Sequence, residues 1–285
     1  MTPRRIKAVR AAQRHDVGNL YTRLAFSIEA AEQLDPFLLL AHHGPQQFPP
    51  NSVKPAFGAH PHRGFETVTF ILDGELLHAD SGGHESLIHG GGVQWMTAGA
   101  GVVHEEAAPD SFWRNGGSLE MLQLWVNLPS RLKMTPPRYT GIEASGIPTI
   151  PLAGDAGALA LISGEYAGTS GPAASLTDIF MSTVSLRAGA HGHLPAPDQR
   201  TVLFYITRGD VVIDGRKLGA GDLVMFDEQG DTVDVESSGG AHILFGHGQA
   251  IGEPVVAAGP FVMNSKEEIE QAYEDYRSGK FEAAS

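Results

Sequence analysis

The chain has 285 residues, with 20 lysines and arginines, 33 aspartates and glutamates, 13 histidines and no cysteine, so its formal net charge is −13. This acidic balance argues against direct binding to nucleic acid, which requires clustered cationic side chains. The lack of cysteine excludes disulfides, iron–sulfur clusters and cysteine-based zinc sites. A hydrophobic fraction of 42% with 19% charged residues is typical of globular proteins, and the length suggests about two domains.

The chain begins with a basic segment, residues 1–16, that lacks the apolar core and the small-residue cleavage site of a secretory signal. We interpret it as a solvated N-terminal strand, with an arginine-rich organellar presequence as the alternative. The longest apolar stretch near Pro36, residues 37–41, is far shorter than the roughly 20 residues that span a bilayer. We therefore expect a cytoplasmic protein without a membrane segment, or a nuclear one if the host is eukaryotic.

Short runs of β-branched and aromatic residues, separated by glycine, aspartate and proline, predict strands over most of the chain. The pairs Asp73-Gly74 and Asp214-Gly215 adjoin such runs and are typical of hairpin turns. The 35 glycines favour many tight turns and hence many short strands. The clearest strands are expected at residues 67–72, 121–126, 202–206 and 222–226.

A proline-rich break between residues 129 and 151 separates two similar units. Residues 66–74 lead, after a gap, to residues 92–96, and residues 201–209 lead in the same way to residues 221–225. This weak internal repeat of about 130 residues suggests two barrels of one kind. We place the first domain at residues 1–137 and the second at residues 138–285.

Helical periodicity is convincing only near the C-terminus, where Ser265 and Glu268 form a capping box. A stripe of apolar residues with i, i+3, i+4, i+7 spacing follows and ends before Gly279. We expect this stripe to pack against a barrel rather than to bind a partner. It consists of Ile269, Ala272, Tyr273 and Tyr276.

A histidine-rich segment concentrates the chemistry, since eight of the 13 histidines lie between His42 and His104. On a strand, residues i and i+2 point to the same face, so His60 and His62 can face inward together, as can His104 and Glu106 on a second strand. Three imidazoles and one carboxylate can hold a divalent metal and leave positions open for O₂ and a substrate oxygen. The pair is followed by a glutamate four residues later, by a glycine turn and by a later Gly-x-x-His at residues 101–104. This arrangement resembles the two-part signature of the cupin barrel.

Longer segments resemble the hallmark motifs of the pirin family, and together they cover the chain from about residue 20 to residue 280. The resemblance implies an all-β fold of two cupin-type β-barrels, a bicupin, with a short C-terminal helix and one metal ion in the N-terminal barrel. The matching segments are residues 60–69, 94–99, 123–129 and 259–264, together with residues 35–40 and 267–269.

The resemblance also implies ligands, a metal and an activity. By position the ligands are His60, His62, His104 and Glu106. The metal is usually iron, with nickel, copper, manganese, cobalt or zinc as alternatives. Several members have an activity like that of quercetin 2,3-dioxygenase, and eukaryotic members have a role as transcriptional co-regulators.

Two other glutamates and two other histidines are set apart from these ligands. In many cupins the carboxylate ligand is placed as Glu66 is here, whereas in pirins it follows the last histidine by two residues, so we give Glu66 a supporting or structural role. Glu105 has the opposite strand parity to Glu106 and should point away from the metal. His42 and His43 lie where the chain departs from the family pattern, and we expect them to be exposed or hydrogen-bonded.

The second barrel is expected to be metal-free. Aligning the glycine turns of the two repeats places only prolines and valines opposite the four ligands of the first barrel. His191 and His193 are out of this register by four residues, so we expect them at the surface or in a loop. The residues opposite the ligands are Pro195, Pro197, Val233 and Val235.

The leading functional hypothesis is a metal-dependent dioxygenase that opens the ring of a flavonol-like polyphenol such as quercetin with O₂. The substrate's 3-hydroxyl would bind the metal, which lowers the pKa of the hydroxyl, and Glu106 would accept the proton. Gln123 and Trp125 lie on a strand that would line the substrate pocket, with barrel packing as the alternative.

Two other functions are compatible with the sequence. The first is a non-enzymatic transcriptional co-regulator whose metal oxidation state changes its binding to a protein partner. The acidic charge argues against contact with DNA by this protein alone, but not against a basic protein partner. The other is an isomerase or a different small-molecule cupin.

Overall fold

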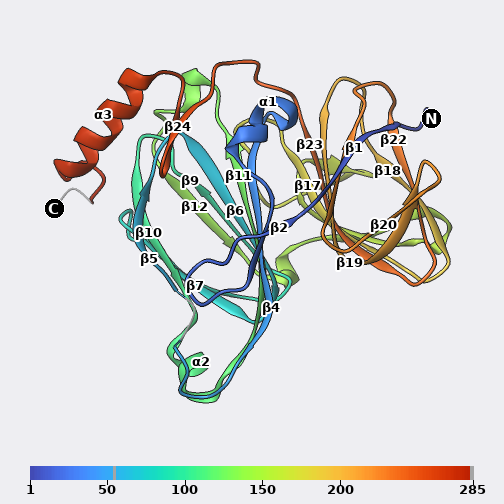
Figure 1. Cartoon of the computed structure of the whole chain (residues 1–285), viewed down its shortest axis with the longest axis horizontal. Coiled ribbons are helices and arrows are strands. Elements are labelled where there is room, and N and C mark those ends of the chain that lie inside the picture. Colours follow the sequence, from blue (N-terminus) through green and yellow to red (C-terminus); the bar gives the residue numbers. More distant parts are fainter. Residues whose placement is uncertain (54–55, 283–285) are drawn as a thin grey trace. The chain divides into compact units, whose positions relative to one another are not determined.

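The computed structural model describes residues 1–53 and 56–282, most of which form short strands (Figure 1). The strands form two compact units, which confirms the prediction of an all-β fold with two barrels. The first barrel comprises Arg14–Ala31, Phe37–Ser145 and Ile251–Ser285. The second barrel comprises Met1–Gln13, Glu32–Pro36 and Gly146–Ala250.

This division differs at both ends of the chain from the predicted domains, residues 1–137 and 138–285. The N-terminal strand β1 (Ile6–Ala11) pairs antiparallel with β21 (Asp222–Phe226), so the start of the chain belongs to the second barrel. The C-terminal helix α3 (Lys266–Arg277) packs on β24 and β25 of the first barrel. The placement of both chain ends depends on long-range strand pairing and helix packing, which local sequence patterns do not reveal.

Two sheets build the first barrel, with the strand orders β12-β9-β6-β11-β4-β3-β2 and β5-β10-β7-β8. A short antiparallel pair, β24 and β25, lies in the C-terminal segment. The strands are β2 (Gln13–Arg14), β3 (Thr22–Phe26), β4 (Phe37–Phe48), β5 (Ala56–His62), β6 (Phe65–Asp73), β7 (Glu75–Asp80), β8 (Glu85–His89), β9 (Val93–Thr97), β10 (Val102–Ala107), β11 (Gly117–Asn127), β12 (Arg138–Ile142), β24 (Val256–Ala258) and β25 (Phe261–Met263).

The second barrel repeats this plan. Its main strand β19 lies between β21 and β23, as β6 lies between β9 and β11, which explains the internal repeat in the sequence. The pair β18–β22 corresponds to β5–β10. The remaining strands of this barrel, besides β1 and β21, are β13 (Thr149–Pro151), β14 (Gly157–Ser163), β15 (Glu165–Tyr166), β16 (Thr169–Ser170), β17 (Phe180–Leu186), β18 (Ala190–Pro195), β19 (Thr201–Ile213), β20 (Arg216–Gly219), β22 (Thr232–Ser237) and β23 (Ala241–Gly248).

The two predicted hairpin turns have different outcomes. Asp214-Gly215 joins β19 to β20 as a two-residue hairpin, with Ile213 opposite Arg216 and φ values of 49° and 73°, so this prediction is confirmed. Asp73-Gly74 joins β6 to β7, which lie in different sheets, so the hairpin prediction is wrong here. The chain turns a corner at Gly74, whose φ is 89° and whose place leaves no room for a Cβ beside the Ser118 carbonyl oxygen.

Helices are few and short. The capping box of α3 is confirmed, because the Ser265 side chain accepts a hydrogen bond from the Glu268 backbone while the Glu268 side chain reaches back. Ile269 and Ala272 are buried against Phe261 and its neighbours, as the apolar stripe predicts. None of the helices in the described chain is long and apolar enough to cross a membrane. The others are α1 (Ala31–Leu34), α2 (Asp110–Asn115) and the 3₁₀ turns at Ile28–Ala30, Ser130–Leu132, Ala144–Gly146 and Ala153–Asp155.

Candidate metal centre

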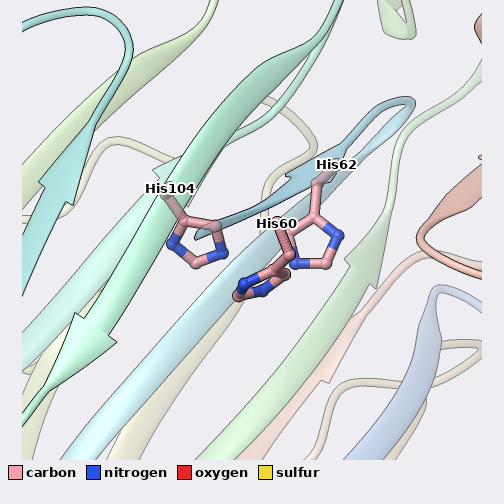
Figure 2. A group of neighbouring side chains, drawn as sticks. All are labelled: His60, His62 and His104. Carbon is pink, nitrogen blue, oxygen red and sulfur yellow. The ribbon is translucent and has the colours of Figure 1, made fainter. Parts of the chain in front are cut away.

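Three imidazoles converge inside the first barrel, from the neighbouring strands β5 and β10 (Figure 2). His60 and His62 share one face of β5, and His104 on β10 lies directly opposite His60 in the pairing register. The ring centroids are 4.4 Å apart for His60 and His104, 4.8 Å for His60 and His62, and 5.0 Å for His62 and His104. One ligand nitrogen from each residue lies within 4.8 Å of the other two. The sequence prediction therefore placed these three side chains together correctly.

Hydrogen bonds set the tautomers of two of these rings. His60 donates from Nδ1 to the Gly58 carbonyl at 2.7 Å, and His62 donates from Nδ1 to the Pro260 carbonyl at 3.2 Å. Each ring thus keeps a lone pair on Nε2, as metal-binding histidines do. Among the described residues, neither buried ring nitrogen of His104 has a hydrogen-bond partner. Unpaired buried nitrogens are costly, and a metal ion bound at this point would satisfy them.

The protonation states of the rings fit a metal. Burial, together with the neighbouring imidazoles, holds the pKa of His62 and that of His104 well below the ordinary value. Both rings are therefore neutral at pH 7, which is the form that binds metal. Imidazole ligands suit borderline divalent ions such as iron, nickel, copper and zinc.

Glu106 is buried on β10, two residues after His104, but it is not a member of the three-histidine group. The β5–β10 register shifts between His104 and Glu106, so this carboxylate is offset along the strand. Its Oε1 accepts a hydrogen bond from Thr69 Oγ1 at 2.9 Å, and its Oε2 accepts one from Gln123 Nε2 at 3.2 Å. The function of Glu106 as a fourth ligand and proton acceptor stays a prediction.

The two residues predicted to line the substrate pocket both border this centre. Gln123 lies on β11 and contacts Glu106 as described, and it also donates to Thr69 at 3.3 Å. Trp125, two residues further on, meets His62 edge to face with 5.3 Å between ring centroids, and it packs on Phe65. Their contact with a substrate stays a prediction, but both side chains reach the centre from one face of β11.

His78 was not assigned a function from the sequence, yet it is buried beside the centre. On β7 it lies opposite Glu106 of β10, and its ring is 5.4 Å from that of His104. It stacks on Tyr139 with 3.9 Å between ring centroids, and Nε2 donates to Asp80 at 3.1 Å. Burial raises the pKa of Tyr139 to about 12, so the phenol is neutral. The sequence indicates only that His78 shares a strand face with Leu76. Its approach to the centre depends on the long-range pairing of β7 with β10, which the sequence did not predict.

The histidines and glutamates that were set apart from the ligands are mostly buried. His42 donates from Nε2 to Glu120 at 3.0 Å, and His43 forms a 2.8 Å hydrogen bond with Thr22, so both are hydrogen-bonded as predicted. Glu66 is buried, accepts a 2.6 Å hydrogen bond from Thr97 and has its pKa raised to about 7 by burial.

On β10, Glu105 is exposed between buried neighbours, so it points away from the centre as its parity predicts.

The C-terminal segment supports the centre from outside the strands that carry the ligands. Besides the Pro260 carbonyl that fixes His62, it supplies Asp275, whose carboxylate accepts a 2.9 Å hydrogen bond from the buried Arg63. Buried Lys133 donates to the Gly64 and Val262 carbonyls at 2.8 Å and 3.0 Å. These contacts tie the turn that follows His62 to the end of the chain, a connection that the sequence did not predict.

The corresponding face of the second barrel is filled with apolar side chains. Val233 and Val235 are fully buried, as is Leu194, which lies opposite Val233 as His60 lies opposite His104 in the first barrel. Leu194 therefore takes the place of His60, and the predicted alignment of Pro195 with His60 is wrong by one residue. His191 and His193 alternate with these inward residues and are exposed on the opposite face of β18. Surface positions are what the sequence predicted for this pair.

Comparisons with known proteins agree with this geometry. Residues 18–126 match the family model described as Pirin, and residues 181–282 match the one described as the pirin C-terminal cupin domain. A Pseudomonas aeruginosa protein named "Putative quercetin 2,3-dioxygenase" is 41% identical over 95% of both chains. Pirin-1 of Arabidopsis thaliana is 39% identical over 87% of this chain and 83% of its own length.

Solved structures give the same result. The crystal structure of a quercetin 2,3-dioxygenase from Acinetobacter baumannii has a TM-score of 0.93 and 38% identity, and the match covers 99% of each chain. The two family models match most of the chain, and the P. aeruginosa relative and the solved structure match nearly all of it. The chain belongs to the pirin family.

Proposed function

We propose that this chain is a metal-dependent dioxygenase that opens the ring of a flavonol-like polyphenol such as quercetin with O₂. The observation that carries the proposal is the convergence of His60, His62 and His104, with two tautomers fixed by backbone carbonyls. Two similar proteins, at 41% and 38% identity, carry quercetin 2,3-dioxygenase in their names, which supports this reaction class. We propose iron as the ion, with nickel, copper, manganese, cobalt and zinc as alternatives.

When bound, a divalent ion supplies Lewis acidity that lowers the pKa of a coordinated hydroxyl, and it gives access to O₂ chemistry. The three histidines would hold it through Nε2 of His60 and His62 and through a buried nitrogen of His104. Glu106 would accept the proton of the substrate hydroxyl. Because Thr69 and Gln123 hold its two oxygens, the carboxylate is already oriented before substrate arrives.

We assign the proton to Oε2 of Glu106, whose hydrogen bond to Gln123 is the longer of the two at 3.2 Å. Trp125 offers an aromatic surface beside His62 for the rings of a polyphenol. The electrons for ring opening come from the electron-rich deprotonated substrate, so no redox-active side chain is required.

The test is aerobic turnover of quercetin by the full chain after removal of bound metal and separate loading with iron, nickel, copper or manganese. We expect consumption of quercetin coupled to consumption of O₂ with at least one metal. If no metal supports product formation, the dioxygenase proposal is wrong and a non-enzymatic function through a protein partner becomes the better explanation.

Matched variants test the proton acceptor. We expect Glu106→Gln to lower turnover about 10²–10⁴-fold, which is the usual contribution of a positioned general base. Glu105→Gln removes a carboxylate from the exposed face of the same strand and should leave turnover unchanged. Full turnover by Glu106→Gln with metal bound would show that another group accepts the proton.

A further inference from the structure

A second histidine cluster lies on the outer face of the second barrel, outside the centre described above. His191 and His193 share the exposed face of β18, with 4.9 Å between their ring centroids. Asp234 on β22 lies directly opposite His193, and Glu236 lies opposite His191 on the same face. One ligand atom from each of His191, His193 and Asp234 lies within 4.8 Å of the others. Two imidazoles and a carboxylate at this spacing form a metal-ligand set.

The hydrogen bond within the cluster leaves ligand atoms that can bind a cation. Asp234 Oδ1 accepts a 2.7 Å hydrogen bond from Nδ1 of His193, which leaves the lone pair of His193 on Nε2. The second carboxylate oxygen of Asp234 is available in addition, since a carboxylate offers two acceptor atoms. The side chains of His193 and Asp234 are 41% and 34% exposed, so a hydrated ion can reach them without unfolding.

The surroundings favour a cation over an anion. His191, Asp234 and Glu236 are among the residues that line a cleft of about 960 Å³ in the second barrel. Five carboxylates and three cationic side chains line the cleft, so its formal charge is −2 with neutral histidines. The cationic side chains are already engaged in part, because Arg4 donates to backbone carbonyls and Arg5 pairs with Asp214. A negative, solvent-filled cleft raises the local concentration of divalent cations.

We propose that His191, His193 and Asp234 form a second, surface binding site for a borderline divalent cation such as Zn²⁺ or Ni²⁺. The site does not depend on the dioxygenase activity and shares no residue with the centre in the first barrel. Its ligands are accessible to solvent, and water would occupy the remaining positions around the ion. It therefore binds more weakly than the three-histidine centre, in which His62 and His104 are buried. We expect the dissociation constant for Zn²⁺ at this outer site to be at least about tenfold higher than at the inner site.

Calorimetric titration of the metal-free full chain with Zn²⁺ tests the proposal. We expect two binding events, and the double variant His191→Ala/His193→Ala should lose only the weaker one. His62→Ala/His104→Ala should lose the tighter event and keep the weaker one, which separates the two sites. Asp234→Asn should weaken the second event about tenfold.

A matched control tests whether removal of any surface histidine changes Zn²⁺ binding. His89 is exposed and hydrogen-bonded to Glu143 at 2.9 Å, but it has no second histidine in its cluster within the described chain. His89→Ala should therefore leave both events unchanged, and circular dichroism would verify that each variant is folded. A single binding event in the wild-type chain, or a second event that survives in His191→Ala/His193→Ala, would overturn the proposal. Quercetin turnover should be the same in that double variant and in the wild-type chain, since its residues lie outside the first barrel's centre.

Discussion

Each barrel carries a His-x-His pair on corresponding strands, β5 in the first barrel and β18 in the second, yet the two pairs point to opposite sides. On β5 the pair faces the barrel interior and meets the imidazole of His104 on β10. On β18 the inward positions are taken by Ala190, Gly192 and Leu194, so the histidines face solvent. Leu194 takes the place of His60 in the strand pairing, and His191 and His193 lie three residues and one residue before it. Because both offsets are odd, the second pair points to the opposite face of its strand.

The partner strand decides what each pair can bind. In the first barrel the partner is the buried, neutral imidazole of His104, and the rings of His62 and His104 lose their water on folding. In the second barrel the partner is the carboxylate of Asp234, which remains accessible to solvent. Desolvation strengthens every electrostatic interaction within the inner centre, whereas water competes with each ligand of the outer one. The same His-x-His spacing should therefore support tight metal binding in the first barrel and weak metal binding in the second.

The largest expected effect comes from removal of the partner imidazole. His104→Ala should weaken metal binding in the first barrel by at least ~100-fold, because a direct ligand contributes no less than the supporting residues around a metal. Quercetin turnover should fall to the background level. The measurement is metal content per chain after dialysis, together with turnover, and retention of one metal ion per chain would contradict the ligand assignment.

A second large effect is expected from placing an imidazole inside the second barrel. Val235 is fully buried, so Val235→His puts a larger polar ring into a packed apolar core and should destabilise the barrel by about 2–4 kcal/mol. It should not create a metal site, because no further ligand faces it from the inward positions of β18. Urea denaturation gives the stability change. Glu236→Gln, on the exposed face of the same strand, should stay within about 0.5 kcal/mol of the wild-type chain.

The contrast between the two His-x-His pairs indicates which features of the fold and the site can be predicted from local sequence. Strand parity predicted that His60 and His62 share a face, because i, i+2 spacing is a local property. The resemblance to the cupin signature added His104, which lies on another strand. The internal repeat placed His191 and His193 out of register with the ligands, and in the structure they lie on the exposed face of β18. Local pattern thus predicted many short strands and the shared face of His60 and His62, and the family resemblance supplied the two-barrel fold and the third histidine.

Long-range pairing accounts for what the sequence did not predict. The exchange of chain ends between the barrels depends on the pairing of β1 with β21 and on the packing of α3, neither of which follows from a short segment. His78 reaches the centre only because β7 lies beside β10. The Pro260 carbonyl that fixes the His62 tautomer lies 198 residues away in the chain.

A third prediction concerns the turn that follows the inner pair. Gly64 has a φ of 90°, and a Cβ there would lie 2.0 Å from the Val262 carbonyl oxygen. Gly64→Ala should destabilise the first barrel by at least about 2 kcal/mol and should displace the C-terminal segment that holds His62. Loss of the Pro260 contact should weaken metal binding about tenfold. Calorimetry and urea denaturation measure the two effects, and wild-type values in both would show that the segment is not coupled to the centre.

A fourth prediction uses His247, which is buried in the second barrel and is not part of either histidine pair. It stacks on Phe180 with 4.6 Å between ring centroids, and burial, aided by Arg200 and Arg4, lowers its pKa to about 3. An unfolded imidazole takes up a proton below about pH 6.5, whereas the folded one stays neutral until about pH 3. The stabilisation is therefore complete above pH 6.5 and is lost progressively as the pH falls from 6.5 towards 3.

The variant His247→Phe keeps the stacking and removes the titration. Between pH 7.5 and pH 5, the wild-type second barrel should lose about 2 kcal/mol of stability that the variant does not lose. Urea denaturation at several pH values measures the difference between the two slopes. Parallel pH profiles would show that His247 is not kept neutral by the fold, and the barrel interior would then be more polar than its packing indicates.

The smallest expected effect comes from the residue between the outer histidines. Gly192 faces the interior of the second barrel, and the nearest atom to an added Cβ would be Leu186 Cδ2 at 3.6 Å, an ordinary contact distance. Gly192→Ala should therefore change the stability by less than about 1 kcal/mol, and in the stabilising direction, because alanine restricts the unfolded chain. Zn²⁺ binding at His191 and His193 should not change, since the new methyl group points to the opposite face of β18. A loss of Zn²⁺ binding without a loss of stability would mean that Gly192 shares a face of β18 with the histidines. The opposite orientation of the two His-x-His pairs would then be wrong.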